Sequence, residues 1–317
     1  MKMVTLKDIA REAGVSKALV SYYLSGSKAG RMSRETAERI GNAVKKLNYR
    51  PNRLARSLRT GKSRNIGFLV GNISDCYFGH LTEEVLNAAR LLDYSPIIAV
   101  TRHSPKEKGE ALDFLMRNRI DGLLIAVSIA DVPQRELLAE NGIPVLRFTY
   151  PEPDAVSLLC DISAALLEAC RCFKERGHTS MFGYFDRMLP WNRLLDIAAE
   201  QAGIELVHKT YYSAEERGEI LRYIEEERPS AILLNGMTLY DVLNRLETIP
   251  GYFPELIIGV DEFRILRESP QIIGAIRTCT AEKARRGVRL LVDRLEQPAL
   301  PREEVIYLPP AEFVRYC

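Results

Sequence analysis

Residues 5–25 constrain the fold most, because they predict two short helices separated by a tight turn. Thr5 is followed three residues later by Asp8, which is the pattern of a capping box at the start of a helix. Gly14 supplies the positive-φ residue that ends this first helix. Ser16 then caps a second helix. The sequence therefore predicts a helix-turn-helix.

The second of these helices should have an inner and an outer face. Its apolar residues recur at the spacing of a buried helical face, and they are Leu19, Val20 and Tyr23. The residues left on the outside are Lys17, Ala18, Ser21 and Tyr22. A helix-turn-helix presents such a face to the major groove. There a lysine can donate to guanine, and an alanine methyl can lie against a thymine methyl.

Basic residues are concentrated near the N-terminus. Residues 1–64 contain 16 Lys and Arg but 4 Asp and Glu, a net charge of +12, whereas the whole chain has a formal net charge of +2. Residues 65–317 therefore carry a net charge of −10. This asymmetry favours a basic module that neutralises DNA phosphates, joined to an acidic body. An ordinary solvated surface is the alternative.

A third helix and a short basic run follow the first two helices. Ser33 caps the third helix, and Pro51 marks its end. The run from Asn52 to Arg59 is too short to be stable alone, because isolated helices below about 12 residues are marginal in water. Its apolar edge lies between arginines, so two copies could pair in a minor groove with Leu58 wedged between base pairs. An ordinary basic linker is the alternative.

Four motifs occur here in a fixed order: TLKDIAREAGVS at 5–16, VSYYL at 20–24, LNYRPN at 47–52 and ARSL at 55–58. They resemble the N-terminal module of the lactose/galactose-repressor (LacI/GalR) family of bacterial transcription regulators. The resemblance implies base contacts from Lys17, Ala18 and Tyr22, phosphate contacts from Ser16 and Ser21, and a minor-groove lever at Leu58. The further DNA-binding candidates are Thr5, Leu6, Ser33, Asn52, Ala55 and Arg56.

From residue 66 the pattern changes to apolar strands that alternate with amphipathic helices. Helix starts are predicted at Ser104-Pro105 with Glu107, and at Ser213. Two series of strand and helix predict an α/β core of two doubly wound lobes, with a cleft at the carboxyl ends of the strands. The runs suited to a parallel sheet covered on both faces lie at 66–70, 96–100, 122–127, 144–148, 231–234 and 256–260.

This body resembles the effector core of the same family, which is similar to periplasmic sugar-binding proteins. The resemblance implies a helix-turn-helix domain at 1–50, a hinge helix and linker at 51–64, and an effector-binding and dimerisation core at 65–317. It assigns about 65–159 and 277–304 to the first lobe, and about 160–275 and 305–317 to the second. The cleft residues that it implies are Asp75, Phe78, Arg193, Asn235 and Asp261.

Two further cleft candidates come from side-chain chemistry. Arg147, like Arg193, could pair with a sugar phosphate, because guanidinium binds phosphate through two hydrogen bonds; either arginine could instead be a surface charge. Trp191 could stack on a ligand ring or fill a lobe. Asp261 could accept from a hydroxyl or simply end a strand. We expect the effector to be a carbohydrate or sugar phosphate.

The sequence contains neither the common catalytic and phosphate-binding motifs nor a membrane-spanning segment. No phosphate-binding GxxxxGK[ST], no GxGxxG after a strand and no GxSxG elbow is present. The 6 cysteines are scattered without a CxxC, so we expect neither zinc nor another cofactor. No run approaches the roughly 20 apolar residues of a membrane span, so we expect a cytoplasmic protein without a membrane partner.

The resemblance as a whole implies a homodimer that binds double-stranded DNA at a palindromic operator. We expect it to be a repressor rather than an enzyme. A ligand-responsive α/β enzyme with an added DNA-binding module is the alternative function.

Overall fold

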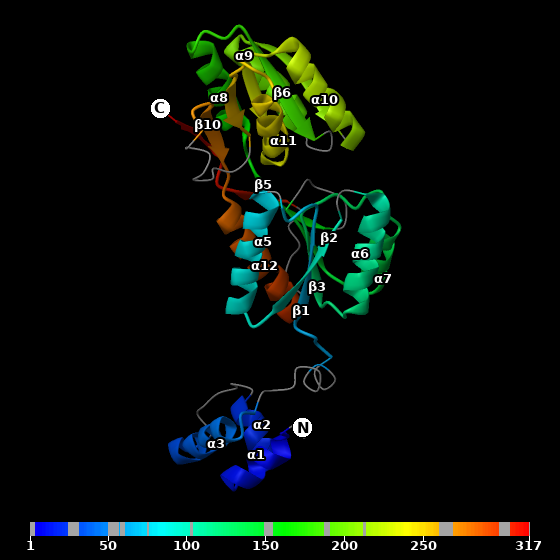
Figure 1. Ribbon diagram of the computed structural model, residues 1–317. Coiled ribbons are helices and arrows are strands. Elements are labelled where there is room, and N and C mark those ends of the chain that lie inside the picture. The colour runs from blue at the N-terminus through cyan, green and yellow to red at the C-terminus, as the bar shows by residue number, and fades with distance from the viewer. Residues whose placement is uncertain are drawn as a thin grey trace. The chain divides into compact units, whose positions relative to one another are not determined.

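The computed structural model describes residues 4–24, 32–49, 57, 61–74, 76–101, 104–148, 155–186, 191–211, 214–259, 269–297 and 305–316. The chain divides into two compact units, residues 1–63 and 64–317. The smaller unit contains α1 (Leu6–Ala13), α2 (Lys17–Leu24) and α3 (Arg34–Lys46) (Figure 1). The larger unit contains two six-stranded sheets among the described residues.

Local signals in the sequence determine the helix ends of the smaller unit. The Asp8 carboxylate accepts hydrogen bonds from the backbone N–H of Thr5 at 2.9 Å and from its hydroxyl at 2.7 Å. Gly14 has a φ of 63°, a left-handed conformation that favours glycine, and it ends α1 as predicted. Ser33 caps α3 by accepting from the N–H of Thr36 at 3.2 Å. The helix-turn-helix prediction is confirmed.

The core of this unit is small and apolar. Its fully buried members are Ile9, Val20 and Ile40, one from each helix. The prediction that Tyr23 faces inward is only partly right, because its side chain is 37% exposed. Its hydroxyl lies against α3 at Gly41, where a Cβ atom would come within 2.9 Å of it. Tyr23 thus packs α2 against α3 at the edge of the core.

The first sheet of the larger unit has the strand order β11-β5-β4-β3-β1-β2, all neighbours being parallel. Helices α5 (Cys76–Leu91) and α12 (Thr280–Glu296) cover one face, and α6 (Pro105–Arg117) and α7 (Gln134–Glu140) cover the other (Figure 1). The strands are β1 (Asn65–Val70), β2 (Ser95–Val100), β3 (Gly122–Ile125), β4 (Val145–Arg147), β5 (Val156–Cys160) and β11 (Val305–Leu308).

The second sheet has the order β12-β10-β9-β8-β6-β7, with β12 antiparallel to β10 and the other neighbours parallel. Helices α8 (Ser163–Glu175) and α9 (Trp191–Ala202) lie on one face, and α10 (Ala214–Glu227) and α11 (Gly236–Glu247) on the other (Figure 1). The strands are β6 (Ser180–Asp186), β7 (Glu205–Tyr211), β8 (Ala231–Leu234), β9 (Glu255–Ile258), β10 (Ile272–Arg277) and β12 (Glu312–Arg315).

The chain crosses between the two sheets three times, and one predicted boundary is wrong. The prediction assigned residues 305–317 to the second lobe, but β11 pairs with β5 of the first sheet, Tyr307 lying beside Leu159. Only β12 joins the second sheet. Cys160 likewise still belongs to β5, so the crossings follow Cys160, Arg277 and Leu308.

The apolar runs identified in the sequence all form strands, with ends that differ by up to two residues from those predicted. The helix start at Ser104 is confirmed, with Pro105 in the first turn, but Ser104 makes no side-chain capping bond. Ser213 lies outside the described residues. In the part of the chain that the structure describes, no helix has both the length and the apolar character of a membrane span.

Candidate functional site: a DNA-reading face and an effector core

The outer face of α2 lies where a DNA-reading surface is expected. Lys17 and Ala18 are exposed in its first turn, and Ser21 and Tyr22 are half-buried one turn later. The Ser16 side chain accepts a hydrogen bond from the N–H of Leu19 at 3.2 Å. Its hydroxyl proton therefore remains available to a phosphate oxygen, close to the positive end of the helix dipole.

Two acidic residues of α1 are paired with basic neighbours. Glu12 accepts from Lys46 at 2.6 Å, which raises the pKa of that lysine through the hydrogen bond and the nearby charge. Asp8 pairs with Arg11 at 2.5 Å. These pairs reduce the electrostatic repulsion that a DNA phosphate would meet.

The remaining DNA-binding candidates divide into two groups. Thr5 and Ser33 are exposed and serve as helix caps, while Leu6 packs partly against the core. Their contacts with DNA stay a prediction. Asn52, Ala55, Arg56 and Leu58 lie outside the described residues.

Two of the predicted cleft residues are integrated into their lobes. Phe78 is 5% exposed in the first-lobe core, and its ring lies 5.4 Å from that of Tyr77. Asn235 is 2% exposed and caps α11, accepting from the N–H of Thr238 at 3.2 Å and from its hydroxyl at 3.0 Å. Asn235 sits at the carboxyl end of β8, so it is both a structural cap and a residue at the edge where ligands bind.

Of the cleft candidates Asp75, Trp191, Arg193 and Asp261, the structure describes only the side chain of Arg193. Arg193 is exposed on α9. Trp191 is the first residue of α9, but its side chain is outside the description, as are Asp75 and Asp261. The assignment of these residues to the effector cleft stays a prediction.

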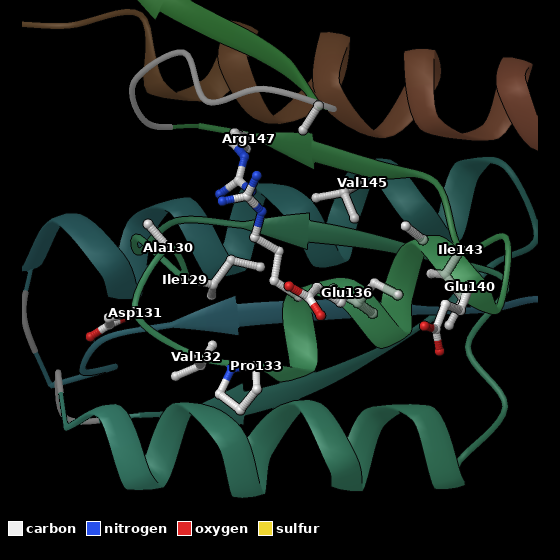
Figure 2. A pocket seen from close by; sticks show the side chains of 14 residues that line it. Ile129, Ala130, Asp131, Val132, Pro133, Glu136, Glu140, Ile143, Val145 and Arg147 are labelled. Atoms are coloured by element: carbon white, nitrogen blue, oxygen red, sulfur yellow. The ribbon is translucent and has the colours of Figure 1, made fainter.

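Arg147 lies in a pocket of about 760 Å³ between β4 and α7 (Figure 2). Every residue that lines this pocket belongs to the first lobe, so the pocket is not the interlobe cleft in which Arg147 was predicted. The reason is the alternation of strand side chains. Val145 and Arg147 face the pocket, whereas Leu146 and Phe148 face α12 at Gly287.

The lining of this pocket contains both positively and negatively charged side chains. The Arg147 side chain is 2% exposed, and Figure 2 shows the Glu136 carboxylate on the same cavity. Asp131, another lining residue, accepts two hydrogen bonds from the buried Lys108 at 3.0 and 3.1 Å. A lining with carboxylates of its own is less suited to a phosphate than one with arginines alone.

A contact between the lobes was missed by the sequence analysis. The Cys76 sulfur, at the start of α5, lies 3.5 Å from the Tyr240 hydroxyl on α11. Tyr240 lies one turn into α11, the helix that follows β8, on the side of the carboxyl edge of the second sheet. The order of strand and helix contained that signal, because α5 follows β1 and α11 follows β8, and each helix therefore begins at the carboxyl edge of its sheet.

Comparison with known proteins gives a family match for the smaller unit. Residues 5–52 match the family described as bacterial regulatory proteins, lacI family. Catabolite control protein A of Staphylococcus aureus is 31% identical over 179 residues, which make up 56% of this chain and 54% of that protein. The chain thus spans about half the length of the relative it matches. That relative is named as a control protein, not as an enzyme.

Solved structures resemble between 80% and 99% of the chain. The lac repressor dimer bound to operator and the anti-inducer ONPF has a TM-score of 0.75 at 19% identity, over 99% of this chain and 98% of that one. The Cra transcriptional dual regulator of Pseudomonas putida with fructose 1-phosphate has a TM-score of 0.68 at 16% identity, over 80% of this chain and 99% of that one. The predicted fold, a helix-turn-helix module with a periplasmic-binding-protein-like core, is confirmed.

Proposed function

We propose that this chain, which belongs to the LacI/GalR family of bacterial transcriptional regulators, binds a palindromic operator as a homodimer under the control of a small-molecule effector. The observation that carries the proposal is the outer face of α2. Lys17 and Ala18 are exposed on a helix whose opposite side, at Val20, is completely buried. A rigid helix with an exposed basic end is what reading a major groove requires.

A single module of this kind would recognise only a few base pairs. Two modules related by a two-fold axis read half-sites about one helical turn, roughly 34 Å, apart, so a symmetric dimer implies a palindromic site. The run at residues 52–59 would lie between the half-sites in the minor groove. This arrangement couples DNA affinity to the distance between the two runs.

An effector would act through the two lobes. A ligand that binds between them favours one lobe arrangement and shifts the equilibrium between operator-binding and released states. A carbohydrate or sugar phosphate is the class we propose, since Cra was solved with fructose 1-phosphate. We propose that the ligand weakens operator binding and so relieves repression. A ligand that strengthens operator binding, a corepressor, would act through the same two lobes.

The test is selection of binding sites from randomised duplex DNA by the full-length protein. We expect a consensus with two-fold symmetry. Selection without a consensus, or with an asymmetric one, would contradict the proposal.

A matched pair of lysine variants then tests the reading face. Lys17→Ala should weaken operator binding by about 1–3 kcal/mol and change the preferred base at one position of each half-site. The control is Lys106→Ala, which removes an 84% exposed lysine from α6 of the core and should leave affinity unchanged. An unaltered consensus for Lys17→Ala would show that this lysine contacts only phosphate.

A further inference from the structure

The three crossings between the sheets are held together by hydrogen bonds. The first follows Cys160 at the end of β5, the second includes Cys279 after β10, and the third includes Pro309 after β11. The N–H of Ala311 donates to the carbonyl oxygen of Asp161 at 2.8 Å, which ties the third crossing to the first. A change in the angle between the lobes must pass through these few residues.

Two thiols meet at this point. The Cys160 sulfur lies 3.2 Å from the Pro309 carbonyl oxygen, and the Cys279 sulfur lies 3.6 Å from the same oxygen. The two sulfurs therefore approach one carbonyl oxygen, Cys160 from the first crossing and Cys279 from the second. Both cysteines are free and only partly buried. The two crossings thus place two free thiols on the same carbonyl oxygen.

The surroundings favour a thiolate at Cys160. Hydrogen bonds from the Cys279 thiol and backbone N–H, together with the charge of Lys283, lower the pKa of Cys160 to about 7, against the opposing effects of desolvation and Asp161. The pKa of Cys279 is raised, chiefly by its hydrogen bond with Cys160. Cys279 occupies the N-cap position of the 17-residue helix α12 without a side-chain capping bond, and the positive end of that helix adds to the stabilisation of a nearby anion.

Another cysteine of the chain shows the contrast. Cys170 is completely buried in the second-lobe core, and desolvation raises the pKa of its thiol to about 12. Such a thiol is inert at neutral pH.

We propose that Cys160 and Cys279 form a peroxide-responsive disulfide that links two of the three crossings. The Cys160 thiolate attacks hydrogen peroxide, an S–O bond forms, the O–O bond breaks and hydroxide leaves. Cys160 is thereby oxidised to a sulfenic acid, and the peroxide is reduced. The Cys279 sulfur then attacks the Cys160 sulfur as its own proton is lost. The S–S bond forms, the S–O bond breaks, and the departing hydroxide takes up that proton as water.

The bond would act on the lobe arrangement. A disulfide fixes its sulfurs at about 2.05 Å and its Cβ atoms at about 3.8 Å, so the first and second crossings could no longer shift past each other. If the proposed function holds, the oxidised protein should show a smaller effector-induced change in operator affinity, and a dithiol reductant should restore it.

The experiment treats the full-length reduced protein with hydrogen peroxide and maps disulfides by mass spectrometry of peptides. We expect a Cys160–Cys279 link that a dithiol removes. The Cys279→Ser variant keeps a hydroxyl donor but has no second sulfur, so it should instead accumulate a sulfenic acid at Cys160 that a dimedone-type reagent labels. Cys160→Ser should leave Cys279 unmodified. A link between other cysteines, or no link, would overturn the proposal.

Alkylation rates provide a second readout that does not depend on DNA binding. At pH 7 Cys160 should react about threefold faster than a thiol of ordinary pKa, because the gain in thiolate exceeds the loss of intrinsic nucleophilicity. Cys279→Ala removes the thiol donor and should slow the reaction at Cys160, whereas Cys279→Ser should slow it less. Equal rates in both variants and the parent would contradict the assigned hydrogen bond. If the Cys160–Cys279 disulfide forms but the protein does not bind an operator, that result would contradict only the proposed function.

Discussion

Gly287 of α12 packs closely against Leu146 of β4 and against Phe148, which follows that strand, and substitution there should destabilise the core. A Cβ atom at this position would lie 2.4 Å from one ring carbon of Phe148 and 2.7 Å from the next. Phe148 is 4% exposed and packs edge-on against Phe68 at 6.1 Å, so its ring has little room to turn away. Helix and strand must therefore separate locally to admit a methyl group.

The expected magnitude follows from two opposing effects. Overpacking of a buried contact costs typically 1–3 kcal/mol, and the rigid ring puts this case near about 3 kcal/mol. Replacing a helical glycine by alanine stabilises the helix by about 1 kcal/mol through its higher helix propensity. Gly287→Ala should thus lower the free energy of unfolding by about 2 kcal/mol, or the melting temperature by about 4–8 °C for a unit of this size.

The matched control is Gly218→Ala in α10. An added Cβ there meets no atom within 4 Å, so only the helix-propensity gain of about 1 kcal/mol remains. Urea unfolding and thermal unfolding of the full-length variants, followed by circular dichroism, measure the difference of about 3 kcal/mol between the two substitutions. If Gly287→Ala were as stable as Gly218→Ala, the close packing of α12 on β4 would be refuted.

Further substitutions test the pH dependence and the caps. Hydrogen bonds, first from Arg176 and then from His178, lower the pKa of Glu255, so its stabilising contribution is complete above the ordinary carboxyl pKa and is lost as the pH falls through the lowered value. Urea midpoints of Glu255→Gln should therefore depend less on pH below about 4.5 than those of the parent, and an identical acid profile would exclude this role. Asp8→Ala should destabilise the smaller unit by about 1 kcal/mol through loss of the α1 cap, and hydrogen exchange in α1 should report it; unchanged protection would argue against the capping box. Asn235→Ala should cost about 1–2 kcal/mol in thermal unfolding of the core through loss of the α11 cap, and a variant of parental stability would leave Asn235 with a role in binding only.

Sequence reasoning succeeded where the determining interactions are local. Thr5, Asp8 and Gly14 act within one or two turns of their own helix, so the pattern of residue types is sufficient to predict α1 and the turn after it. The buried strands of the core were also found, because both faces of each are covered and the apolar run is continuous.

The errors concern interactions between distant parts of the chain. The partner of β11 is β5, which lies in a remote stretch of sequence, and the short apolar run at 305–308 contains nothing that selects one sheet over the other. Arg147 was assigned to the interlobe cleft on charge alone. Its actual direction depends on which face of the first sheet α7 covers, and that is a property of the assembled lobe.

The pairing of β5 with β11 has a consequence for biosynthesis. The first sheet is assembled from segments that flank all of the second lobe except β12 in the sequence, so the ribosome must synthesise residues 161–304 before β11 can complete it. Until then β5 presents an unpaired edge, and α12 is missing from one face of the lobe for most of that time. Nascent chains of this protein should therefore depend on chaperone cover over a long stretch of translation, and the second lobe, nearly continuous in sequence, should become protease-resistant first.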